Sequence, residues 1–217
     1  MEMDTRQYCR LTLLFTLIAS CSVAEEHIPP SSMRSEAIVK FVDGSLINDE
    51  INASVNDDWT LTSGIYAHAQ ELSEQLGTPF VVSRITSGRE LLLTILMDKM
   101  QNELISHVIQ HSDVKDAAPL MDTDSSPNRP LAVRIVFVTG SPSHQAILEE
   151  GDDDSGEITA IAESLVADFP HATTAQAVPP DQLVLDLDSR AITRKFVEQL
   201  RALEVVAYAQ PNFIFKH

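Results

Sequence analysis

The strongest constraint on the fold of this chain is an internal repeat. The segment "VKDAAPLM" at residues 114–121 aligns with "VAYAQPNF" at residues 206–213, and Pro119 matches Pro211 at an offset of 92 residues. The segments before these two copies follow a common order of apolar runs and turns. Each half therefore predicts the order strand, helix, strand, strand, helix, strand.

The first half begins with the apolar run "AIVKFV" (37–42), which predicts a strand. Apolar residues at helical spacing follow and stop at Gly77, a typical helix end. The runs "FVVSRI" and "ELLLTIL" flank a glycine-containing turn at 86–89 and predict a hairpin. Asp98 with Gln101 predicts the capped start of a second helix.

The second half repeats this order. The run "LAVRIVFV" (131–138) predicts its first strand, and Asp154 with Glu157 predicts a capping box for a helix. The runs "AQAV" and "LVLDLD" flank residues 179–182 as a second hairpin, and Ser189 begins a helix.

This order has a physical consequence for the architecture. Two right-handed strand-helix-strand crossovers joined by a hairpin give a four-stranded antiparallel sheet with both helices on one face. We expect an α+β chain of two tandem ferredoxin-like (βαββαβ) domains at 35–121 and 131–217. Serine, aspartate, asparagine and proline cluster at 122–130, which predicts a linker between the halves. The opposite face of each sheet is expected to stay bare.

Residues 1–21 resemble a bacterial export signal with an apolar stretch at 11–19, too short to span a bilayer as a helix. The segment "IASC" ends at Cys21 and resembles the lipobox, in which the cysteine is acylated. Conventional cleavage after Ala24 is the alternative. Polar residues and two prolines at 22–34 predict a tether.

The first alternative predicts an exported outer-membrane lipoprotein that faces the periplasm or the cell surface and touches the membrane only through its lipid anchor. The second predicts a soluble periplasmic or secreted protein. The chain has 15 Lys and Arg against 32 Asp and Glu, a formal charge of -17. Such a charge repels nucleic-acid phosphates, so nucleic-acid binding is not expected.

The last strand carries a resemblance to a known family. "VVAYAQPNFIFKH" (205–217) resembles the C-terminal end of the propeptides of subtilisin-like serine proteases, the inhibitor I9 family, which commonly reads V-x-Y-A-E-P-N-x. "AIVKFVDG" and "SRITSGRELLLTI" resemble the opening and middle of the same family. Gln210 replaces the usual acidic residue, and the first copy lacks the usual aromatic residue. The matching residues of the last strand are Val206, Tyr208, Ala209, Pro211 and Asn212.

In that family the propeptide is a folding template and inhibitor, whose sheet face packs on the enzyme and whose C-terminal segment lies in the substrate cleft. The resemblance implies a stand-alone inhibitor or folding chaperone of a subtilisin-like serine protease, without a cofactor. Its tail would add as a strand to the cleft edge. The expected protease-binding residues are Tyr208, Pro211, Asn212, Phe213, Ile214, Phe215, Lys216 and His217.

A different class of function is compatible with the same pattern. The last strand can be a plain edge strand, and the chain a non-inhibitory envelope lipoprotein that acts as a protein–protein interaction or assembly module. In that case the two bare sheet faces bind each other or another periplasmic protein.

Catalytic and metal-binding alternatives are weaker. The segment "DDSG" (153–156) mimics the catalytic aspartate region of subtilisin-like proteases, but the chain has no His-Gly-Thr-His and no Gly-Thr-Ser stretch. We therefore expect no enzymatic activity. His107 and His111 lie four apart on a predicted helix, but spacing identifies no third ligand, so no metal site is expected. Trp59 is expected to pack against the sheet.

Overall fold

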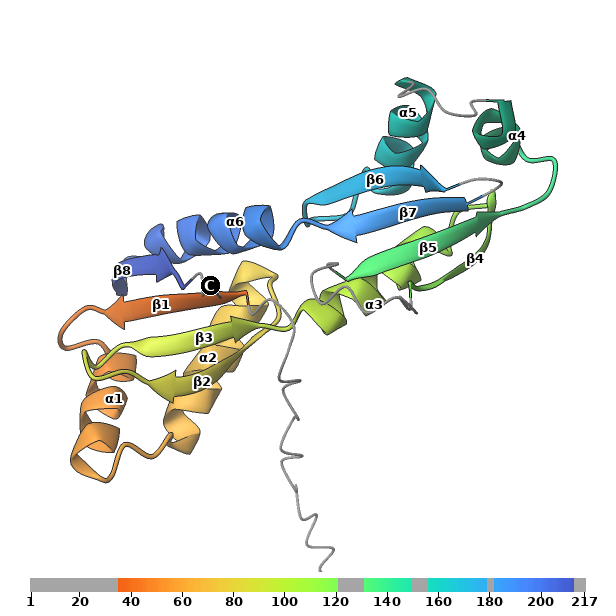
Figure 1. The fold of residues 1–217 in the computed structure, drawn as a ribbon. Coiled ribbons are helices and arrows are strands. Elements are labelled where there is room, and N and C mark those ends of the chain that lie inside the picture. Colours follow the sequence, from red (N-terminus) through yellow and green to blue (C-terminus); the bar gives the residue numbers. More distant parts are fainter. Residues whose placement is uncertain (1–34, 121–130, 150–155, 179–181, 213–217) are drawn as a thin grey trace, which may run out of the picture. The chain divides into compact units, whose positions relative to one another are not determined.

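The computed structural model describes residues 35–120, 131–149, 156–178 and 182–212. Within these ranges the chain forms two four-stranded antiparallel sheets and six helices (Figure 1). The α+β prediction is confirmed. The predicted export signal, tether and linker, and the tail from Phe213 to His217, lie outside the described residues.

The first sheet has the strand order β2-β3-β1-β8 and the second has the order β4-β5-β7-β6. The first consists of β1 (Glu36–Phe41), β2 (Phe80–Ile85), β3 (Leu91–Ile95) and β8 (Val206–Pro211). The second consists of β4 (Val114–Pro119), β5 (Ala132–Phe137), β6 (Thr173–Val178) and β7 (Gln182–Leu187). The helices are α1 (Leu46–Asn56), α2 (Ser63–Leu76), α3 (Met97–Val108), α4 (Pro142–Glu149), α5 (Gly156–Leu165) and α6 (Ser189–Arg201).

The sequence predicts that β4 and β8 each pair within their own half, but in the structure the two strands are exchanged between the sheets. β8, from the second repeat, pairs with β1 of the first, whereas β4 pairs with β5 of the second. The two pairings are equivalent in register, because Tyr208 lies opposite Lys40 and Asp116 lies opposite Val136, each next to a β-bulge. Since β4 and β8 present the same pattern to equivalent partners, local sequence does not select between the two sheets.

This pairing divides the chain at new positions. Residues 35–95 and 189–212 form what we call lobe A, and the described residues between 97 and 187 form lobe B. Lobe B is therefore an insertion between β3 and α6 of lobe A. Residues 122–130, predicted as a linker between halves, lie in the segment that joins two neighbouring antiparallel strands of one sheet, β4 and β5.

Lobe A has a core on one face of its sheet. Alternate residues of β1 contribute to this core, as do Ile51 of α1, Ile65 of α2 and Phe196 of α6. The Phe196 ring lies 5.1 Å from that of Phe80, between centroids. Gln199 of α6 also donates a hydrogen bond to the backbone oxygen of Leu76, at 3.4 Å.

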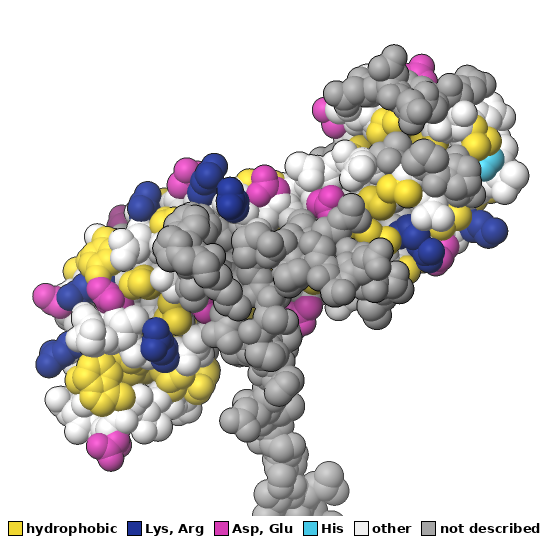
Figure 2. Space-filling model, in the orientation of Figure 1, with side chains coloured by type: hydrophobic (Ala, Val, Ile, Leu, Met, Phe, Trp, Pro, Cys, Tyr) yellow, Lys and Arg dark blue, Asp and Glu magenta, His cyan; other side chains and the backbone are white. Residues whose placement is uncertain are grey.

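The opposite face of sheet A, which we call the helix-free face, turns toward the viewer in Figure 1, where α2 passes behind the sheet. Because side chains alternate along a strand, this face carries most of the residues of β1 and β8 that are partly buried or exposed. Figure 2 shows hydrophobic side chains on this side of lobe A, interspersed with basic and acidic ones. The residues that define it on these two strands are Ile38, Lys40, Tyr208 and Gln210.

Lobe B has a comparable core, in which alternate residues of β5 and β7 meet Leu104 of α3 and Leu165 of α5. The start of α3 departs from the sequence prediction. Its N-cap is Leu96, with no side-chain capping bond, because the helix begins directly after β3 and places Asp98 within its first turn. Gln101 instead donates from Nε2 to the backbone oxygen of Ala132, at 2.9 Å, and ties α3 to β5.

Two predicted helix boundaries are confirmed. The helix α2 ends at Gly77, which has a φ of 61° and adopts the left-handed conformation that glycine tolerates best. The helix α6 begins at Ser189, and Asp188 caps it by accepting bonds from the backbone nitrogens of Arg190 and Ala191.

The environment of Trp59 differs from the prediction. Its side chain is 46% exposed and does not pack into the core. Asp58 and Trp59 have φ values of 58° and 60°, so the chain turns in the left-handed region directly after α1. The Trp59 backbone nitrogen donates to the Ser54 oxygen at 2.9 Å, which holds this turn against the end of α1.

Candidate functional site

Strand β8 carries the residues for which the sequence predicts a binding role, and it lies at an edge of sheet A. Val206 and Ala209 point into the core, whereas Tyr208 is 39% exposed and Gln210 is exposed. A shallow groove of about 400 Å³ runs beside the strand and is lined by Arg201 and residues 206–210. The strand is thus anchored on one face and accessible on the other.

Tyr208 is held on the helix-free face by contacts with the turn between β2 and β3. Its hydroxyl donates a hydrogen bond to the Glu90 carboxylate, which also accepts one from the Thr86 hydroxyl. Lys40, the neighbour of Tyr208 on β1, donates from Nζ to the backbone oxygen of Gly88 at 3.4 Å. These contacts tie β8 to the hairpin across β1, so the Tyr208 hydroxyl is engaged within the lobe while its ring faces outward.

The end of β8 is fixed by Glu36, at the start of β1. The backbone nitrogen of Asn212 donates to the Glu36 backbone oxygen at 2.8 Å, and its side-chain Nδ2 donates to Glu36 Oε2 at 2.7 Å. Glu36 is only 1% exposed. A buried carboxylate is costly without donors, so its bond to Asn212 stabilises this end of the strand.

The outer edge of β8 is poorly suited to pairing with another strand. Arg201 donates from Nε to the Ala209 backbone oxygen at 2.8 Å and so occupies one of the edge acceptors. Because Asn212 bonds to β1 and hydrogen bonds alternate along the strand, Pro211 is directed outward, where it offers no N–H. Binding through the helix-free face or the tail is therefore favoured over strand addition at this edge.

The structure brings together three of the predicted site residues, Tyr208, Pro211 and Asn212, at the end of sheet A. The tail residues Phe213, Ile214, Phe215, Lys216 and His217, and the predicted lipidation site Cys21, lie outside the described residues. Sequence reasoning missed Glu36, Glu90 and Arg201. Glu90 is 118 residues from Tyr208 and Glu36 is 176 from Asn212, so only the β1–β8 pairing could have revealed them.

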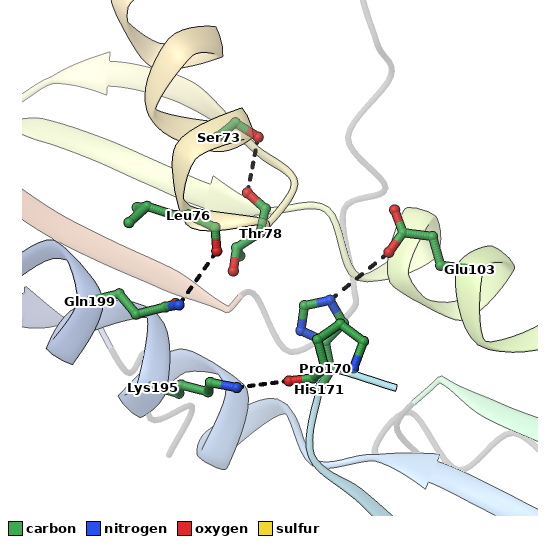
Figure 3. Close-up of polar contacts among 8 residues, drawn as sticks. All are labelled: Ser73, Leu76, Thr78, Glu103, Pro170, His171, Lys195 and Gln199. Carbon is green, nitrogen blue, oxygen red and sulfur yellow. Dashed lines mark hydrogen bonds and ion pairs between the residues drawn. The ribbon is translucent and has the colours of Figure 1, made fainter. Parts of the chain in front are cut away.

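A second cluster of titratable groups surrounds His171, after α5 (Figure 3). The His171 side chain is buried, and its Nε2 has no hydrogen-bond partner among the described residues; Glu103 Oε2 of α3 lies 3.9 Å away. Lys195 of α6 donates to the backbone oxygen of Pro170 at 2.8 Å. Burial lowers the pKa of His171 below its ordinary value of 6.5, and the nearby Lys195 charge lowers that pKa further.

His107 and His111 extend this cluster through contacts between their rings. Their rings lie 5.9 Å apart, and the His107 ring lies 5.7 Å from that of Phe169, which in turn contacts His171 at 5.3 Å. In the part of the chain that the structure describes, no group of three or more histidine, cysteine or acidic residues could hold a metal ion. We interpret the cluster as a packing contact of aromatic and imidazole rings.

The lowered pKa of His171 predicts a pH-dependent stability. Because the unfolded chain takes up this proton at a higher pH than the folded chain, the free energy of unfolding should fall as pH drops from 6.5 toward the folded pKa. Replacement of His171 by Phe should flatten the pH dependence across this window. Urea unfolding at pH 7.5, 6.5 and 5.5 measures this dependence, with His68→Gln, at a partly exposed position of α2, as the control. The prediction would be contradicted if the free energy of unfolding changed with pH in the same way for His171→Phe and for the unaltered chain.

Comparisons of the chain with protein-family models, with curated proteins and with solved structures return no match. The described residues include no helix that is both long and apolar enough to cross a membrane. The function must therefore be argued from the residues and their geometry.

Proposed function

We propose that this chain is a stand-alone propeptide-like inhibitor or folding chaperone of a subtilisin-like serine protease. The observation that carries the proposal is the position of the Tyr208–Asn212 motif, on an edge strand that is firmly held as far as Asn212. The residues that follow Asn212 would occupy the substrate cleft as an extended peptide. Backbone hydrogen bonds would supply affinity, and Ile214 or Phe215 would fill an apolar subsite.

Lobe A is the unit to which we assign this role. Its elements β1, α2, β2, β3, α6 and β8 follow the βαββαβ order. Its strand order β2-β3-β1-β8 supports the interpretation of lobe A as a ferredoxin-like domain. In this proposal lobe B interrupts the domain between β3 and α6 and is a permuted relative of lobe A. The inhibitory unit thus combines the first repeat's sheet with the second repeat's last helix and strand.

The helix-free face of lobe A would pack on the protease. Ile38 and the Tyr208 ring offer apolar surface there, and Lys40 contributes one positive charge in a chain of net charge -17. Exposed aromatic residues are favoured at protein interfaces because they bury a large area at low entropic cost. The mechanism is stoichiometric occupation of the cleft, with no chemical step performed by this chain.

Titration of the full chain against a panel of subtilisin-like proteases tests the proposal. We expect stoichiometric loss of activity for at least one member, or faster refolding of a member that lacks its own propeptide. A chymotrypsin-type serine protease is the control and should keep its activity. If no member is inhibited or refolded, and a pull-down from envelope extract returns no protease, the proposal fails. The assembly-module alternative would then be favoured, with the interaction made through the sheet faces of the two lobes.

A further inference from the structure

The two lobes place the same backbone contact in different side-chain settings. In lobe B the strand β4 ends with the Leu120 nitrogen donating to the Ala132 oxygen at 2.9 Å. In lobe A the equivalent bond runs from the Asn212 nitrogen to the Glu36 oxygen at 2.8 Å. Only the pair in lobe A adds a side-chain bond, from Asn212 Nδ2 to Glu36 Oε2 at 2.7 Å. Leucine and alanine cannot form such a bond, so lobe B is an internal reference without it.

The extra bond constrains the chain immediately before Phe213. A backbone bond alone fixes one point of Asn212, whereas the additional bond fixes the orientation of its side chain. Because Glu36 is buried, water competes little with its carboxylate for the Asn212 side-chain donor, and the hydrogen bond is correspondingly strong. Ordering the root of a binding segment before it meets its partner reduces the entropy lost on binding.

We propose that Glu36 is a positioning residue, which clamps Asn212 and thereby sets the direction in which the following residues leave lobe A. This inference rests on the proposed function, because it assigns the clamp a role in presenting the tail to a protease. Glu36 acts through Asn212 and does not itself contact the partner.

The test reverses the donor and the acceptor of the side-chain bond. Asn212→Asp places two acidic groups together and removes the donor, so the clamp should open. The double variant Glu36→Gln with Asn212→Asp restores a bond, because the introduced amide can donate to the introduced carboxylate. Asn102→Asp is the matched control, since it makes the same chemical and charge change at an exposed position of α3 in lobe B, outside the proposed binding face.

Two readouts are measured on the full chain. The first is amide hydrogen exchange at position 212 and along β8, with the amides of β5 and β7 in lobe B as the reference. The second is the inhibition constant for the most strongly inhibited member of the protease panel. For Asn212→Asp we expect about tenfold faster exchange at position 212 and about tenfold weaker inhibition, as loss of a hydrogen bond to a charged group predicts.

The double variant should recover both values, and Asn102→Asp should change neither. Faster global exchange, in lobe B as well as in β8, would overturn the positioning role and leave a general stability effect. Unchanged exchange at position 212 in Asn212→Asp would also overturn it. Lack of inhibition by the unaltered chain counts against the proposed function alone, because the exchange measurement judges the clamp without any protease.

Discussion

Removal of residues 213–217 is expected to weaken inhibition of the target protease by about a hundredfold or more. The proposal places the main cleft contacts in this segment, and a hundredfold change corresponds to about 2.7 kcal/mol of binding free energy, which loss of a few strand bonds and one buried apolar side chain can account for. The truncation keeps every described contact of β8, including both bonds between Asn212 and Glu36. The inhibition constant and the thermal unfolding midpoint are measured on the same preparation.

The control replaces residues 213–217 by a Gly-Ser segment of equal length, which keeps the chain length and removes the side chains. Inhibition retained by this variant would assign the affinity to the backbone, and inhibition lost would assign it to Ile214 and Phe215. An unchanged inhibition constant after truncation would show that the tail is not the inhibitory element. A shift of several degrees in the unfolding midpoint would instead point to a role of the tail within the fold.

Much of the local structure could be predicted from the sequence. Strands and helices alternate as the repeat indicated, because apolar periodicity and turn residues act over short distances. Two helices were missed, although each has a recognisable start. Ser45 accepts a bond from the Asn48 nitrogen at the start of α1, and Ser141 accepts one from the His144 nitrogen before α4, whose first residue is Pro142.

The partner of each closing strand could not be predicted in the same way. β4 and β8 both begin with a buried valine, contain a buried alanine and end with proline, and both pair through the same register. Because the apolar pattern and the register are the same in both pairings, neither gives local information about which sheet each strand joins. The same limitation hid Glu36 and Glu90 from the candidate site, because their contacts with β8 exist only in the pairing that the structure shows.

Engineered disulfides should distinguish this pairing from that of two independent halves, with a nearly all-or-none result. Asp116 lies opposite Val136 in the structure, whereas closure of the first half on itself would place it opposite Lys40 by the equivalence of β1 and β5. Directly opposed residues of antiparallel strands have Cα atoms about 5.5 Å apart when hydrogen-bonded, within the range that a disulfide spans. Both variants are made with Cys9 and Cys21 replaced by Ser.

We expect Asp116→Cys with Val136→Cys to form the disulfide nearly completely in the folded chain, and Asp116→Cys with Lys40→Cys to remain reduced. Peptide mapping after alkylation measures both yields. The opposite pattern would show that β4 stays with its own repeat, and β8 would then return to the sheet of the second repeat. Lys40 and Glu90 would no longer lie near Tyr208, and Glu36 could not clamp Asn212. The crosslinks therefore test the pairing on which both the proposed site and its positioning residue depend.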